Sequence, residues 1–161
     1  MAAREADAMM GPTLLYAVKQ VELAVRAQMD AVLKPHNVTT IQYTALTVLQ
    51  HRNDLTSAAL ARRSFVTAQT MGDIVTALER RGYIVRNPDP AHAKRLTISL
   101  TDEGKRLLAD VRQEVEAIER QMTLGFDSEE QEELRVGLQR CFSNLTAHAG
   151  EDALREMALG A

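Results

Sequence analysis

The sequence predicts a mainly α-helical protein with one small β-hairpin, and three observations carry this prediction. Through most of the 161 residues, apolar side chains recur at three- and four-residue steps, which is typical of amphipathic helices. Between residues 83 and 100 this spacing gives way to two short strand-like runs around a Pro-containing turn, which favour a hairpin. Hydrophobic residues make up 45% of the chain and aromatic residues 4%, so we expect one helical domain over residues 1–161 that is long enough to bury a core.

The first predicted helix runs from about Thr13 to Leu33. It ends at Lys34-Pro35-His36-Asn37, because proline cannot continue a helix. Its apolar face consists of Leu14, Val18, Val21, Val25, Met29 and Val32. A second helix is expected to open at Thr39, which with Gln42 resembles a capping box.

Two further helices joined by a tight turn are predicted over about residues 56–81. Thr56 or Ser57 is placed to cap the first of them, and Thr67 to cap the second, which runs roughly from 68 to 81 and ends before Gly82. The second helix has a buried stripe of Met71, Ile74, Val75 and Leu78 and an opposite polar face of Gln69, Asp73, Thr76 and Arg80. This order of elements is a helix-turn-helix.

A hairpin follows the second helix of that pair. Tyr83–Arg86 predicts one strand, Asn87–Arg95 a loop and Leu96–Leu100 the returning strand. Because Pro88-Asp89-Pro90 cannot sit inside a sheet, we expect the loop to project, with Lys94 and Arg95 placed to contact phosphates or a minor groove. A helix-turn-helix followed by such a wing is a DNA-reading device.

Two long helices are expected after the wing. Thr101 is placed to cap the first, Gly125 breaks it, and Ser128 with Gln131 resembles another capping box. The first carries a heptad seam of Leu108, Val111, Val115, Ile118 and Met122, and the second an apolar face of Leu134, Leu138, Cys141 or Phe142, and Leu145. A small winged domain does not need this much apolar helix, so the helices form either a long hairpin folded on itself or a dimer interface.

Basic residues gather in the DNA-reading segment. Residues 56–101 carry a local charge of +4, although the whole chain has a net charge of −3. The seven basic residues are Arg62, Arg63, Arg80, Arg81, Arg86, Lys94 and Arg95. Because salt confines electric fields to roughly 10 Å, a basic lobe can bind a polyanion even on an acidic protein. A solvated face would be the better interpretation of these arginines alone, but not within a winged helix-turn-helix.

Several function classes lack support in the sequence. Met1-Ala2-Ala3-Arg4-Glu5 does not open a signal peptide, and no run approaches the roughly 18 apolar residues of a membrane span. The single cysteine, Cys141, cannot form an intrachain disulfide, so we expect a cytoplasmic, nucleoid-associated protein without membrane contact. No catalytic constellation and no metal-ligand spacing occurs among the scattered histidines, so neither an enzyme, a metal nor a cofactor is expected.

Several motifs, taken in order, resemble the MarR family of bacterial transcription regulators. They are Leu60-Ala61-Arg62-Arg63, Val66-Thr67-Ala68-Gln69-Thr70, Leu78-Glu79-Arg80-Arg81-Gly82-Tyr83-Ile84, Asp89-Pro90 and Leu100-Thr101-Asp102-Glu103-Gly104. Residues 38–49 are also similar to the family's second helix, so the resemblance covers about residues 14–145. It implies a winged helix-turn-helix lobe over 38–101, dimerisation helices over 12–34 and 102–148, and a C-terminal tail over 149–161.

The resemblance also implies a homodimer whose first and last helices interlock. Its dimerisation residues would be Leu14, Val18, Leu108, Val111, Val115, Ile118, Leu138 and Leu145. Two recognition helices related by a twofold axis reach successive major grooves of double-stranded DNA when they stand about 34 Å apart, so the operator is expected to be a near-palindrome.

The wing tip departs from the family's pattern. Where the family commonly reads Asp-Pro-x-Asp-Arg-Arg, this chain has Asp89-Pro90-Ala91-His92-Ala93-Lys94 and only then Arg95. A second Asp and an Arg are missing, which puts the usual ion pairing within the wing in question. Lys94 lacks the bidentate fork of an arginine, so the wing is expected to supply affinity more than base readout.

Specific DNA contacts are predicted from side-chain chemistry. Gln69 can pair bidentately with adenine, and Thr70 and Ala68 can contact a thymine methyl or a phosphate. Asp73 is expected to orient a neighbouring Arg more than to contact a base. Thr67, the amides beside it and Ser57 are expected to hold phosphates, and Arg86, Lys94 and Arg95 complete the set.

A small effector, often aromatic or anionic, is a further implication of the resemblance, with repression as the default mode. The candidate lining residues are Arg26, Met29, Tyr43, Leu46 and His51, each of which has a competing structural or surface interpretation. Two other functions stay open: a helical interaction scaffold, and a thiol-based redox regulator acting through Cys141. The basic wing argues against the first, and the lack of a resolving thiol argues against the second.

Overall fold

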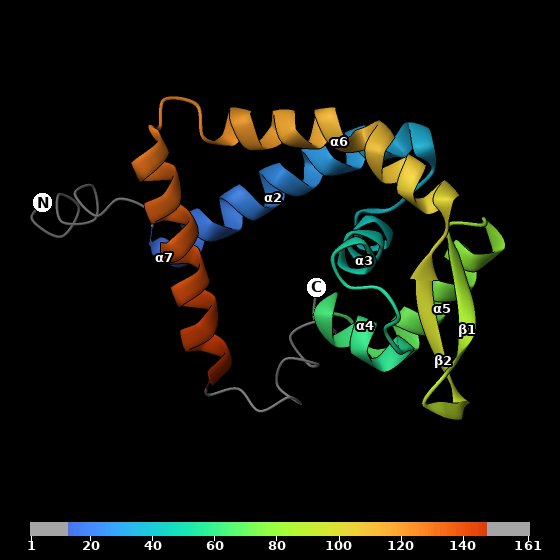
Figure 1. The fold of residues 1–161 in the computed structure, drawn as a ribbon. Coiled ribbons are helices and arrows are strands. Elements are labelled where there is room, and N and C mark those ends of the chain that lie inside the picture. The colour runs from blue at the N-terminus through green and yellow to red at the C-terminus, as the bar shows by residue number, and fades with distance from the viewer. Residues whose placement is uncertain (1–12, 148–161) are drawn as a thin grey trace, which may run out of the picture.

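The computed structural model describes residues 13–147, which are mainly helical and carry one two-stranded antiparallel sheet at one side of the molecule (Figure 1). The elements are α2 (Leu14–Leu33), the 3-10 turn η1 (Lys34–His36), α3 (Thr40–His51), α4 (Ser57–Arg63), α5 (Ala68–Arg80), β1 (Ile84–Asp89), β2 (His92–Leu100), α6 (Asp102–Met122) and α7 (Ser128–Ala147). This confirms the predicted mainly helical fold with a β-wing. The expected tail over 149–161, together with residues 12 and 148 of the dimerisation segments, lies outside the described residues.

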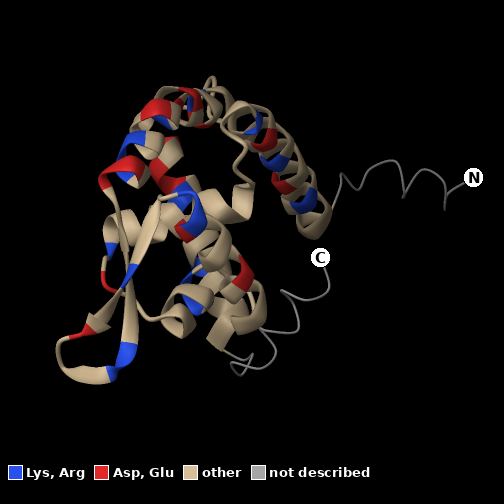
Figure 2. Ribbon diagram, turned by 90° about the vertical axis from the view of Figure 1, so that its right-hand side faces the viewer, with Lys and Arg blue, Asp and Glu red and all other residues tan. Residues whose placement is uncertain are grey.

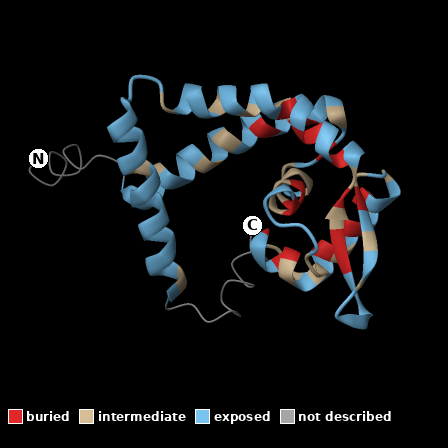
Figure 3. Ribbon diagram, in the orientation of Figure 1, coloured by how far each residue is buried: buried red, intermediate tan, exposed pale blue. Residues whose placement is uncertain are grey.

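One hydrophobic core holds the lobe formed by α3, α4, α5 and the hairpin. Met71, Ile74, Val75 and Leu78, the predicted stripe of α5, are all buried in it. They pack with fully covered side chains from the neighbouring elements, among them Leu46, Leu49, Leu60 and Ile98. Each such burial contributes about 1.5–3 kcal/mol, so this core fixes which face of α5 is left to solvent (Figure 3).

A second, smaller cluster joins α2 to α6, which lie side by side along one edge of the molecule (Figure 1). Met29, Leu33 and Val111 form its buried centre, with Val115 and Ile118 half-buried against them. Leu108 is 4% exposed and Val111 is 0% exposed. This corrects the expectation that Leu108 and Val111 contact a partner chain, because α2 and the lobe already cover them.

The hairpin is longer than the sequence predicted, and its turn is correspondingly tighter. Pairing runs from Ile84 opposite Leu100 to Pro88 opposite Leu96, and then shifts so that Asp89 lies opposite His92. Residues 87–95 are therefore mostly strand, which corrects the predicted loop. Pro88 is tolerated because β1 is an outer strand, where a missing N–H costs no internal ladder bond. On its other side β2 receives the α3–α4 linker, as Ile98 N donates to Leu55 O over 2.8 Å.

A tight corner joins the end of α5, the start of β1 and the start of α6. Gly82 has a φ of 77°, as expected for a residue that follows a helix. Thr101 Oγ1 donates to Gly82 O over 2.6 Å and also accepts from Gly104 N, which makes it the predicted cap of α6. A Cβ at Gly104 would lie only 2.3 Å from Tyr83 O. Only glycine at this position therefore allows α6 to lie so close to the start of the hairpin.

The turn between α6 and α7 contains one correction to the predicted caps. Gly125 breaks the helix as expected, with a φ of 89°. The capping residue of α7 is Asp127, which accepts from Glu129 N and Glu130 N at 2.8 and 2.9 Å, while Glu130 accepts from Asp127 N at 2.8 Å. The predicted pair of Ser128 and Gln131 is therefore displaced by one residue, because a carboxylate accepts N–H groups more strongly than a hydroxyl does.

Candidate nucleic-acid interface

The recognition helix α5 is fixed at its start by Thr67. Its Oγ1 accepts from Thr70 N at 3.1 Å and donates to Thr70 Oγ1 at 2.9 Å, so both threonine side chains are held in place. Ala68, Gln69, Thr70 and Asp73 are exposed on the face opposite the core. The fold thus brings these predicted contact residues together on one accessible surface.

The hairpin presents its cations at its outer end, where Figure 2 shows residues of both signs near the tip. Lys94 is exposed, and Arg95 Nε lies 3.5 Å from Asp89 Oδ2. An ion pair therefore does form within the wing, although the second Asp and Arg of the family pattern are missing. The ion pair with Asp89 offsets part of the positive charge of Arg95. Lys94 is therefore the more available cation for binding DNA.

Two other arginines of the segment are used inside the fold. Arg86 Nε lies 3.1 Å from Glu79 Oε2, and Arg86 Nη2 donates to Thr76 Oγ1 at 3.3 Å, so this side chain binds to α5 and lies away from the wing tip. Arg81 donates to the backbone oxygens of His36, at 2.8 Å, and Asn37, and its guanidinium lies 4.9 Å from the centre of the Tyr83 ring. No local sequence pattern predicts this clamp, because it joins residues about 45 positions apart.

At the start of α4, the capping residue is Thr56, whose side chain accepts from Ala59 N at 3.2 Å. Ser57 is the first helical residue and is partly exposed. Arg62 and Arg63 are exposed at the other end of this helix. All three stand on the same helix-turn-helix as α5, which packs against α4.

The turn between α4 and α5 contains a residue that sequence reasoning missed. Phe65 has a φ of 58° and is 61% exposed, although it lies between Ser64, which is buried, and Val66, which packs on the core. A bulky side chain in the left-handed region is uncommon, and a sequence contains no pattern that predicts it.

The five predicted effector residues do not line one space. Leu46 is 0% exposed and Met29 is 9% exposed, so both are core residues, which corrects their assignment to a crevice. Arg26 Nε donates to Glu22 Oε1 at 2.8 Å on the exposed side of α2, and His51 is exposed at the end of α3. Hollows of 400 and 310 Å³ lie instead at the turn between α6 and α7, lined in part by Glu119, Thr123 and Gln131.

Tyr43 differs from the other four, because it packs against both hydrophobic clusters. Burial raises the pKa of its hydroxyl above the usual value, and nearby Arg112 partly offsets this effect. The phenol therefore stands, uncharged, at the junction of the α2–α6 pair with the DNA-binding lobe.

Other chemistries find no support in residues 13–147. In this part of the chain no three His, Cys, Asp or Glu side chains are grouped so that they could hold a metal ion. None of its helices is both long and apolar enough to cross a membrane. Cys141 is exposed on α7 of the single chain.

Comparisons with known proteins agree with this geometry. The family model described as "MarR family" matches residues 36–95. An HTH-type transcriptional repressor of Mycobacterium tuberculosis is 27% identical over 129 residues, which are 80% of this chain and 93% of that protein. The homoprotocatechuate degradative operon repressor of Escherichia coli is 27% identical over 125 residues, which are 78% of this chain and 84% of that protein.

Solved structures share the fold. The transcriptional repressor CouR, bound to a 23-mer DNA duplex, has a TM-score of 0.73 at 24% identity, and the match covers 80% of this chain and 92% of CouR. A second structure, of CouR from Rhodococcus jostii bound to p-coumaroyl-CoA, has a TM-score of 0.70 at 23% identity over 77% of this chain and 87% of CouR. The relatives named here are regulators of transcription and not enzymes.

Proposed function

We propose, from the premise that this chain belongs to the MarR family of transcriptional regulators, that it is a homodimeric repressor of a near-palindromic operator. The observation that carries the proposal is the solvent-facing surface of α5, with Gln69 and Thr70 exposed, on the same lobe as a hairpin that exposes Lys94. A regulator of this kind would act at the bacterial chromosome.

Each part of this surface would have its own task. Gln69, near the start of α5, would read a base edge in the major groove, because its amide can both donate to and accept from adenine. Thr67 and the first N–H groups of α5 would hold a phosphate at the positive end of the helix dipole. Lys94 would bind a phosphate or enter the minor groove as a point charge, which adds affinity without reading sequence.

A dimer is supported by apolar surface that the single chain leaves open. Leu14 is 85% exposed and Val18 is 55% exposed on one face of α2, while Tyr16 and Leu23, about half a turn away, are 57% and 52% exposed. None of the residues of α7 is buried, and Leu138 and Leu145 are exposed (Figure 3). Large exposed apolar surfaces are typical of interfaces between proteins. A second copy of the chain would cover the apolar residues of α2 and α7 that the first copy leaves exposed.

A small-molecule effector is the third part of the proposal. CouR, a structural neighbour, has been solved both with DNA and with p-coumaroyl-CoA. In this chain Tyr43 is the best-supported candidate contact, since it lies between the lobe core and the α2–α6 cluster. An aromatic or anionic ligand there would release DNA only as far as it prefers the geometry that does not bind DNA.

The test is a titration of the full chain with labelled DNA carrying the inverted repeat nearest its own gene. We expect binding at least about 10³-fold tighter than to a scrambled duplex of equal length. The matched control keeps both half-sites but inserts about five base pairs, half a helical turn, between them, and should lose the specific component. Equal affinity for all three duplexes would reject a sequence-specific dimeric regulator.

The effector is tested separately, on the protein–operator complex. Aromatic acids and their CoA thioesters are added at increasing concentration, and fluorescence anisotropy reports release of DNA. A ligand that dissociates the complex and loses potency in Tyr43→Phe or Tyr43→Ala supports the placement at Tyr43. A ligand whose potency is unchanged by both substitutions places the effector elsewhere.

A further inference from the structure

The turn of the helix-turn-helix contains a strained aromatic residue with no role in the lobe core. Phe65 adopts a φ of 58°, a conformation that favours glycine or asparagine and costs a bulky residue free energy. Its side chain is 61% exposed, so burial within the lobe does not offset that strain. A strained, exposed aromatic residue indicates that the ring is held there for a contact outside the lobe.

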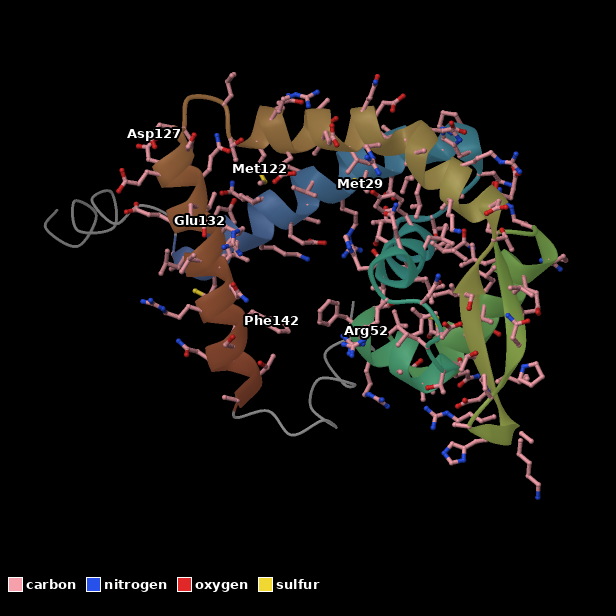
Figure 4. All side chains as sticks on the ribbon, in the orientation of Figure 1. Met29, Arg52, Met122, Asp127, Glu132 and Phe142 are labelled. Carbon is pink, nitrogen blue, oxygen red and sulfur yellow. The ribbon has the colours of Figure 1, made fainter. Side chains whose placement is uncertain are left out.

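That contact is with the last helix of the chain. The rings of Phe65 and Phe142 have their centres 5.7 Å apart and their planes at 78°, which is the edge-to-face arrangement that aromatic pairs prefer. Phe142 belongs to α7 and is 49% exposed (Figure 4). Figure 1 shows α7 standing at the opposite end of the α2–α6 pair from the hairpin, so the two rings bridge elements that are otherwise apart.

Phe65 lies close to the start of the recognition helix, so its contact with Phe142 can affect the position of that helix. Phe65 is two residues before Thr67, which caps α5, and Val66 N, next to it, donates to Ala61 O at 3.1 Å. The turn is therefore short and anchored on α4, so a displacement of the Phe65 ring would be passed to the start of α5. Gln69, the predicted base-reading residue, follows within the first turn of that helix.

We infer that Phe65 and Phe142 form a positioning contact through which α7 holds the start of the recognition helix in the orientation that fits the operator. This inference rests on the proposed function. In this role neither phenylalanine needs to contact DNA, because the pair would act by restricting the positions that α5 can occupy relative to the dimerisation helices. Specific binding, which needs both recognition helices in register, should depend on the pair, whereas non-specific attraction to phosphates should not.

The experiment compares Phe65→Gly, Phe142→Ala and the double variant with the unaltered protein. Phe65→Gly removes the ring and relaxes the backbone, so its thermal midpoint should be no lower than that of the unaltered protein. Phe142→Ala lies on α7, outside the lobe, and tests the other partner without altering the turn. Gln139→Ala, one turn away on the same exposed helix, is the matched control.

Three readouts are needed: affinity for the operator, affinity for unrelated DNA and the oligomeric state by sedimentation. Each single variant should weaken operator binding by about 3- to 10-fold, which matches the strength of an aromatic pair, with binding to unrelated DNA unchanged. Phe65→Gly, which alters only the lobe, should also leave the dimer unchanged. The double variant should be no weaker than either single one, because both remove the same contact. Gln139→Ala should bind like the unaltered protein.

Other results would overturn the inference. If the single variants keep the ratio of operator to unrelated binding, or if their effects add in the double variant, the two rings do not act as a pair. Tighter operator binding in either variant would also reject it, because the contact would then oppose the DNA-bound geometry. An unaltered protein that fails to prefer the operator would instead reject the proposed function. That failure can be distinguished from failure of the Phe65–Phe142 inference, because it is measured on the protein without any substitution.

Discussion

Seven basic residues in the DNA-binding segment carry the same charge, but the fold uses them in different ways. Arg81 clamps the end of α5 to the backbone after α2, and Arg86 pairs with Glu79. Arg95 is paired within the wing. The charge count made from the sequence was therefore correct in total, but it could not separate cations that hold the fold from cations that remain available. That separation depends on partners that are distant in the sequence.

A contrast between two exposed residues tests their different assigned tasks. Gln69→Ala should reduce the preference for operator over scrambled DNA, because a bidentate base contact contributes about 1–3 kcal/mol of discrimination. Lys94→Ala should weaken binding to all duplexes alike and should lower the slope of log K against log salt by about 1. Anisotropy titrations at several salt concentrations measure both quantities. A reduced salt slope for Gln69→Ala, or a lost preference for Lys94→Ala, would contradict the assignment.

Tyr43 makes a prediction about alkaline stability. Its pKa is raised in the folded protein, so the folded state holds the phenolic proton at pH values where the unfolded chain, with a pKa of about 10, has released it. The free energy of unfolding should therefore fall as pH rises above about 10, and Tyr43 should account for part of that fall. Urea unfolding at pH 8 and above pH 10 measures it. In Tyr43→Phe the fall should be smaller, and an equal fall in both proteins would show that Tyr43 does not contribute.

At the level of elements, helix ends were predicted well where a cap follows local rules. Thr39, Thr67 and Thr101 each accept the predicted backbone N–H, and each begins a helix where the sequence placed it. Asp127 was overlooked because Ser128 also fits the cap pattern, and the choice depends on the relative strength of the two acceptors. The hairpin was predicted too short, because the rule against proline in strands does not apply to an outer strand such as β1.

The corner between α6 and β1 can be tested by a single methyl group. Gly104→Ala should lower the free energy of unfolding by about 1–3 kcal/mol or more, because its Cβ would meet the Tyr83 carbonyl at 2.3 Å and the backbone must shift. Gly137→Ala is the matched control, since nothing lies within 4 Å of its Cβ position in α7. That variant should be about 0.5–1 kcal/mol more stable, from helix propensity alone. Equal effects of the two substitutions in urea unfolding would show that the close approach at Gly104 is relieved without cost.

At the level of the whole molecule, the sequence predicted the architecture but not which chain covers each apolar face. Heptad spacing in α6 correctly indicated packing along another helix, yet Val111 turned out to face α2 of the same chain. Periodicity reports that a face is apolar, and it contains no information on whether the covering element is intramolecular. The effector residues were the least predictable, because a crevice between lobes depends on the placement of whole elements, and Leu46 lies in the core.

The proposed dimer can be tested by a substitution at the exposed end of α2. Leu14→Glu should raise the dimer dissociation constant by at least about 10-fold, because a charge replaces an apolar contact and the twofold axis repeats the change. Operator binding should weaken in parallel, while the lobe stays folded. Gln113→Glu adds the same charge to the exposed side of α6, opposite Val111, and should leave the dimer intact. Sedimentation velocity across a concentration series measures both, and a Leu14→Glu protein that stays dimeric would remove this face from the interface.

The corner at Gly82, Thr101 and Gly104 also determines how the lobe can move. Because the last turn of α5, the root of the hairpin and the first turn of α6 are locked to one another, tilting α6 would swing reading helix and wing together, as a single rigid arm. Operators whose half-sites differ slightly in spacing would then be accommodated by a change in the angle between two arms, with each arm keeping its internal shape.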